Sequence, residues 1–158
     1  MSSPASIRKH PIHPMLVALP IGLWVFALVC DIGALTEGSS AWSIAALYCT
    51  VGGIVGAVLA AIPGVIDYFS IDEDAMKRIA TWHLCVNLAA VLIFAVSVWI
   101  RLRVEMAGSL PLLVSLCGVA LIGWGGWLGG EMVYVKGMAV DAVEKLSGEK
   151  QTSGRRAA

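Results

Sequence analysis

The sequence predicts an all-α integral membrane protein: a four-helix bundle with both ends of the chain in the cytoplasm. The prediction rests on the composition, on four long apolar runs and on the placement of the basic residues. Of 158 residues, 58% are hydrophobic and only 14% are charged, whereas about half of a typical soluble domain is apolar. A soluble domain of this length could not hide so much apolar surface, so the expected partner is the lipid bilayer.

Four segments are expected to cross the membrane, at residues 14–35, 42–66, 71–101 and 109–134. The third comprises an amphipathic turn followed by an apolar run at residues 79–100. A helix rises about 1.5 Å per residue, so about 20 residues span a hydrocarbon core of about 30 Å. The first run is too long for the apolar part of a signal peptide and no small-residue cleavage site follows it, so we expect it to be retained. Residues 1–13 should be a cytoplasmic segment, and residues 140–158 a partly disordered cytoplasmic tail.

The basic residues set the orientation. All eleven Lys and Arg residues except Arg101 and Arg103 lie before the first run, between the second and third, or after the fourth. By the positive-inside rule these three regions are cytoplasmic, which predicts a multi-pass membrane protein with both ends in the cytoplasm. Asp31 and Arg101 both lie near the opposite face, where they could form a structural ion pair.

Local signals refine the helices. Ser70 and Glu73 have the spacing of a capping box, which predicts that the third helix begins early, on an amphipathic turn. Pro20 and Pro63 lie inside the first two runs and are expected to kink them. Gly-x-x-x-Gly spacings in the second and fourth runs predict close helix contacts.

Several function classes are disfavoured. A formal net charge of zero argues against nucleic-acid binding. The four cysteines lie singly in apolar runs, without a metal-type spacing, and are interpreted as small buried apolar residues. No nucleophile motif, phosphate loop or zinc-protease motif is present, so a stand-alone enzyme is not expected.

Polar residues at the cytoplasmic boundary form the candidate site. His10 and His13 lie at the start of the first helix, Asp67 at the end of the second, His83 about one turn inside the third, and Glu131 at the end of the fourth. The topology therefore gathers them in one layer of the membrane. Polar groups at this depth are costly, so each one invites a functional hypothesis.

Imidazole is a common ligand of haem iron and of transition-metal ions. His13 and His83 could hold a haem b between helices, if helix tilt closes a depth difference of roughly 8 Å. Alternatively, the histidines with Asp67 or Glu131 could bind a non-haem metal ion, with His10 as a further ligand. Helical spacing places Asn87 on the face of His83, and Trp127 and Tyr134 on that of Glu131; we expect these side chains to line the site.

Simpler roles compete with ligation for each residue. His83 could hydrogen-bond within the bundle, and His10 could be solvated. Asp67 could cap its helix or pair with Arg78, and Glu131 could pair with Lys136.

The segments HPIHPMLVALPIGLWVFALVCDIG and PGVIDY, His83 with Asn87, and GGWLGGEMVY closely resemble the bacterial membrane-protein family called domain of unknown function 2231. The resemblance implies four transmembrane helices and no assigned enzymatic activity. Some relatives carry a Rieske-type iron–sulfur domain, which suggests electron transfer, but this chain lacks the paired Cys and His spacings of such a domain. It also has Lys136 where the family pattern has a histidine, so a complete family-type ligand set is not assumed.

Three hypotheses follow. The first is a small haem- or metal-binding electron-transfer component with a redox partner. The second is a solute or proton transport module, which with so few helices would need a homodimer. The third is a structural or accessory subunit whose polar groups only lock the helices together.

Overall fold

The computed structural model describes residues 3–8 and 10–138, and it confirms the all-α bundle. One short helix and four long ones follow a small N-terminal hairpin. In it, β1 (Ser6–Ile7) pairs with β2 (His10–Pro11), and then come α1 (Ile12–Leu16), α2 (Ala18–Glu37), α3 (Ser40–Phe69), α4 (Asp74–Arg103) and α5 (Ser109–Gly130). A π-helical turn, η1 (Glu131–Val135), extends α5. Four helical stretches, 12–37, 40–69, 74–103 and 109–135, are long and apolar enough to span a membrane.

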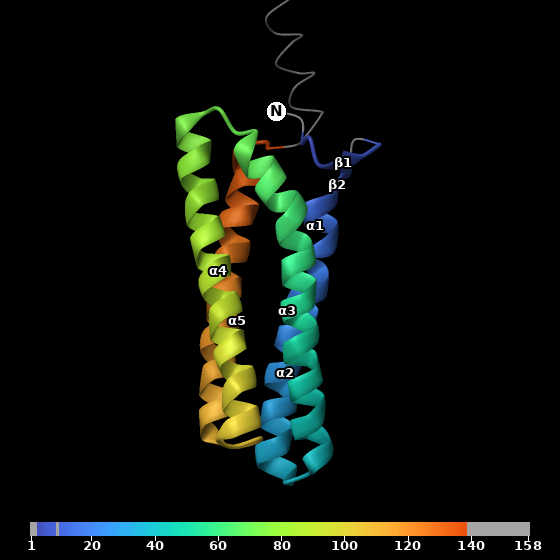
Figure 1. Ribbon diagram of the computed structural model, residues 1–158. Helices are drawn as coiled ribbons and strands as arrows, with labels where there is room; N and C mark the ends of the chain where they lie inside the picture. The colour runs from blue at the N-terminus through green and yellow to red at the C-terminus, as the bar shows by residue number, and fades with distance from the viewer. Residues whose placement is uncertain (1–2, 9, 139–158) are drawn as a thin grey trace, which may run out of the picture.

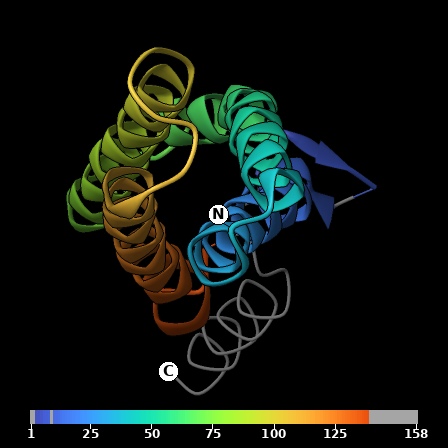
Figure 2. The ribbon, with the colours of Figure 1, turned by 90° about the horizontal axis from the view of Figure 1, so that it is seen from below.

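The bundle consists of two antiparallel hairpins that stand side by side (Figure 1). Helices α1, α2 and α3 form the first hairpin, and α4 and α5 form the second. Seen along the bundle, α2 lies diagonally opposite α4, and α3 lies opposite α5 (Figure 2). The N-terminal hairpin, the α3–α4 connection and the end of α5 share one end of the bundle, which we call the histidine end. The other two connections form the opposite end.

The outer surface suits lipid, and the interior is built from small residues. Large apolar side chains are exposed along all four long helices, for example Val29, Val58, Leu92 and Leu113. Glycines lie where helices approach most closely; a Cβ at Gly118 would come 2.5 Å from the ring of Phe94. Lipid provides no hydrophobic drive between helices, so such close packing holds together the two helices of each hairpin.

The two hairpins also meet on the bundle axis, through side chains of the diagonal helices. The rings of Trp24 and Phe94 stack with centroids 4.2 Å apart and planes 10° apart. Towards the opposite end, Arg101 Nη2 donates to Asp31 Oδ2 at 2.7 Å, and both side chains are almost fully buried. The Asp31–Arg101 pairing expected from the sequence is therefore confirmed.

These axial contacts reveal an internal repeat. The partners Asp31 and Arg101 are 70 residues apart, and so are Trp24 and Phe94. The glycine that accommodates Trp24 is Gly53 on α3, and its counterpart Gly118 on α5 accommodates Phe94. Residues 70 positions apart therefore occupy equivalent places in the two hairpins, and they touch each other on the bundle axis. An approximate two-fold axis along the bundle produces contacts of this kind.

One expectation about a helix end is corrected. Ser70 does not open a capping box; it ends α3, where its hydroxyl donates to Asp67 O, and Glu73 precedes α4 without a side-chain cap. The first helix is interrupted at Val17, three residues before Pro20, whereas α3 runs through Pro63 without a break. The expected tail, residues 140–158, lies outside the described residues.

The ion pair gives a stability prediction. Arg101→Met removes the charge and leaves Asp31 buried without a counterion, which should cost about 3–5 kcal/mol and lower the melting temperature in detergent. The double variant Asp31→Leu/Arg101→Met should recover most of this loss, because no buried charge remains. Arg103→Met, at an exposed position of the same helix, is the control. Equal losses for Arg101→Met and Arg103→Met would contradict the role of the pair.

Candidate functional site

The rings of His13 and His83 meet inside the histidine end. Their centroids are 6.1 Å apart and their planes are nearly perpendicular, at 84°. His13 lies on α1 and His83 on α4, so the rings approach from opposite sides of the bundle axis. This separation is smaller than the depth difference of roughly 8 Å expected from the apolar runs.

Each histidine is held by the second helix of its own hairpin. His13 Nδ1 is 2.7 Å from the carbonyl oxygen of Ala60 on α3, and His83 Nδ1 is 2.9 Å from that of Gly125 on α5. A carbonyl oxygen only accepts, so each Nδ1 carries the proton and donates it. In the neutral ring, Nε2 is then the nitrogen with a free lone pair, as in histidines that ligate metals.

A glycine beside each ring makes this approach possible. A Cβ at Gly64 would come 2.7 Å from His13 Nδ1, and one at Gly129 would come 3.2 Å from Cε1 of His83. Each glycine lies four residues after the carbonyl that accepts the hydrogen bond, so it sits on the same face of its helix. The two histidines are therefore built in the same way, and they too are 70 residues apart.

Asn87 supports the histidine layer from one helical turn further along α4. Its Nδ2 donates to the carbonyl oxygen of His83 at 2.7 Å. The side chain packs against Gly125, the residue that accepts from His83; a Cβ there would come 2.9 Å from the amide. Asn87 thus lies in the helix contact beside His83, on the face that its spacing predicts.

Asp67 and His10 have other contacts. Asp67 is buried, and its Oδ1 accepts from Ser3 Oγ at 2.8 Å and from the backbone N–H of Ala5 at 3.1 Å. His10 is exposed in β2, and its Nδ1 donates to Arg8 O at 3.0 Å. Within residues 3–8 and 10–138, no three His, Cys, Asp or Glu side chains gather at a possible metal position. The structure therefore brings together two histidines without a carboxylate.

Trp127 and Tyr134 do not face the bundle interior as expected. Their exposed fractions are 76% and 89%, so both point to the lipid or its boundary. The buried face of α5 instead carries Gly118, Ile122 and Gly125. Close packing places glycines in the helix contact, and the bulky aromatic side chains turn outward, where membrane interfaces favour them. Glu131 is half-buried at the start of the π-helical turn.

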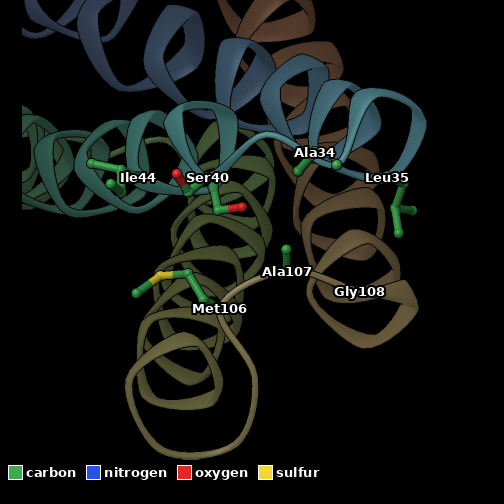
Figure 3. A pocket seen from close by; sticks show the side chains of 9 residues that line it. Ala34, Leu35, Ser40, Ile44, Met106, Ala107 and Gly108 are labelled. Carbon is green, nitrogen blue, oxygen red and sulfur yellow. The ribbon is translucent and has the colours of Figure 1, made fainter.

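A separate open pocket of about 530 Å³ lies at the opposite end of the bundle. Figure 3 shows it between the ends of α2 and α3 and the α4–α5 connection. Ala34, Ser43 and Met106 are among its lining residues, none of which is titratable. The pocket is remote from the histidines: His13 and Ala34 are 21 residues apart along α1 and α2, or roughly 31 Å of helix.

The family model described as "Predicted membrane protein (DUF2231)" matches residues 9–142. The chain belongs to this family. The match covers both hairpins, including His13, Asp67, His83 and Asn87. No curated protein and no solved structure matches this DUF2231 protein.

The two histidines of this DUF2231 protein were predicted from its sequence, but their symmetric setting was not. The missed observation is the constant separation of 70 residues from His13 to His83 and from Asp31 to Arg101. A search for internal repeats could have used it, together with the glycine pairs Gly53/Gly118 and Gly64/Gly129.

The glycine contacts give a second prediction. Gly64→Ala should displace the His13 ring from Ala60 and lower the melting temperature, although alanine is intrinsically the better helix former. Gly126→Ala is the matched control, because nothing lies within 4 Å of its added Cβ; it should be neutral or slightly stabilising. Thermal unfolding in detergent would test this, and similar behaviour of the two variants would refute the close approach.

Proposed function

We propose that this DUF2231 protein binds haem b through Nε2 of His13 and His83, and that it serves as a small electron-transfer component of a bacterial inner membrane. One observation carries the proposal. Two imidazoles, each with Nδ1 donating to a backbone carbonyl, lie 6.1 Å apart on the axis between the hairpins. This arrangement leaves the Nε2 lone pair of each ring available at the histidine end and fixes the tautomers that present these lone pairs.

The other two axial levels show why the histidine level suggests an occupant. At those levels the opposed residues complement each other: Trp24 stacks on Phe94, and Asp31 pairs with Arg101. His13 and His83 are identical groups, and each already uses its proton on its own hairpin. A cationic metal centre would satisfy both Nε2 atoms at once.

The number of ligands favours haem over a bare ion. Metal–nitrogen bonds are about 2 Å long, so two of them with the half-widths of the rings span about 6 Å, close to the observed separation. A bare divalent ion usually takes three or four protein ligands, whereas haem iron receives four nitrogens from its porphyrin. The described residues gather no third ligand of the usual kinds.

These contacts assign a role to the haem and to each surrounding residue. Bound haem would supply one-electron chemistry. Ala60 and Gly125 would fix the orientation of the two rings, and Asn87 would brace α4 against α5. The basic residues of the sequence favour the cytoplasm for the histidine end, because loops rich in Lys and Arg remain on that side.

The test is an absorbance spectrum of the detergent-purified chain, expressed with haem supplied. We expect a Soret band and about one haem per chain. The spectra of the oxidised and reduced protein should be those of haem with two histidine ligands. His13→Ala and His83→Ala should each lose this spectrum, because each removes one of the two residues that would hold the haem.

His10→Ala is the control and should retain the spectrum, since this ring is exposed and bonded to Arg8. Absence of a Soret band in the wild-type chain would refute haem binding. Elemental analysis would then distinguish a bare metal ion from a cofactor-free structural subunit.

A further inference from the structure

The N-terminal segment before α1 lies at the histidine end of the bundle, beside the start of α1 (Figure 1). We call residues 3–8 with 10–11 the N-terminal strap. Its β1–β2 hairpin leads directly into α1, and the carbonyl oxygen of Ala5 accepts from Ile12 N at 3.0 Å. Ala5 is buried. Because Ile12 is bonded to the strap and His13 is the next residue, a displacement of the strap would also displace His13.

The two histidines differ in the support that their own helices give them. His83 lies inside the 30-residue helix α4, whereas His13 lies in α1, which has only five residues and is interrupted from α2 at Val17. Pro20 has no N–H to donate to the carbonyl oxygen of Leu16, so the helical ladder is weakened at this interruption. His13 consequently needs a support that His83 does not.

Asp67 provides a contact of the required kind. It lies near the end of α3, two residues before the last helical residue, Phe69, and its Oδ1 accepts from both Ser3 Oγ and Ala5 N. Hydrogen bonds to an ionised carboxylate are among the stronger ones in proteins. The same helix holds His13 through Ala60, so α3 fixes the strap and the ring together.

The second hairpin has an apolar residue where the first has Asp67. By the equivalence that pairs Gly64 with Gly129, the counterpart of Asp67 is Met132. Met132 packs with Met76 and Ala80 of α4, the helix that carries His83. The carboxylate thus occurs in the hairpin whose histidine depends on a non-helical strap.

We propose that Asp67 is a positioning residue for His13: by holding the N-terminal strap on α3, it keeps the His13 ring against Ala60 and opposite His83. Its consequence for haem rests on the proposed function, but the positioning itself does not. Removal of both hydrogen bonds should free the strap and α1, and expose the His13 ring. Retention of an acceptor at position 67 should preserve both contacts.

The experiment compares Asp67→Leu, which has no acceptor, with Asp67→Asn, which keeps an amide oxygen. Carbethoxylation by diethyl pyrocarbonate is measured by mass spectrometry on the full chain prepared without added haem. His10, exposed in the wild-type chain, serves as the internal standard. We expect the His13/His10 modification ratio to rise at least about tenfold in Asp67→Leu, since each hydrogen bond to a carboxylate is worth about an order of magnitude. It should stay within about twofold of wild type in Asp67→Asn.

Haem titration of the same proteins separates this inference from the proposed function. If the ratio rises but the wild-type chain takes up no haem, the proposed function fails and the positioning role stands. If the wild-type chain binds haem and Asp67→Leu leaves the ratio unchanged, the positioning role fails alone. A ratio raised equally by Asn and Leu would also overturn it. Should Asp67→Leu fail to fold, Ser3→Ala, which removes one of the two bonds, should still raise the ratio severalfold, and an unchanged ratio would refute the proposal.

Discussion

A charged side chain inside a bilayer costs about 3 kcal/mol or more unless it is paired, and in this bundle Asp31 finds its counterion on the diagonal helix. Arg101 also bonds to the hydroxyls of Ser97 and Ser115, so a single guanidinium joins three of the four long helices. A slip of one hairpin by one turn, about 5.4 Å, would separate the charges. The ion pair therefore sets the vertical register of the hairpins, and rigid helices carry that register up to Trp24 and Phe94 and to the two histidines.

Much of the fold could be predicted from hydropathy alone, because a helix that crosses lipid needs a long apolar run and little else. The approach of His13 to His83 was also predictable, since the alternation of crossings brings both to one side of the membrane. The Asp31–Arg101 pair followed from the same reasoning. In each case one physical constraint, the cost of polar groups in lipid, was sufficient to place the residue.

Other features could not be predicted, for identifiable reasons. The outward direction of Trp127 and Tyr134 depends on which face of α5 carries the closest helix contact, and that contact is decided by glycines rather than by polarity. The strap and its bonds to Asp67 join segments more than 60 residues apart without any periodic signal. The repeat was obscured because its axial partners, Trp24 with Phe94 and Asp31 with Arg101, are different residues. Only at the histidine level are they the same.

The repeating unit crosses the membrane twice, and this has a consequence for the two ends of the bundle. A unit with an even number of crossings returns to the side on which it began, so two copies in one chain have the same orientation rather than opposite ones. Both imidazoles therefore lie towards the same end of the bundle, and both members of the ion pair lie towards the other. The bundle is therefore asymmetric from end to end: its paired imidazoles lie towards one end, and a buried, charge-neutral ion pair lies towards the other.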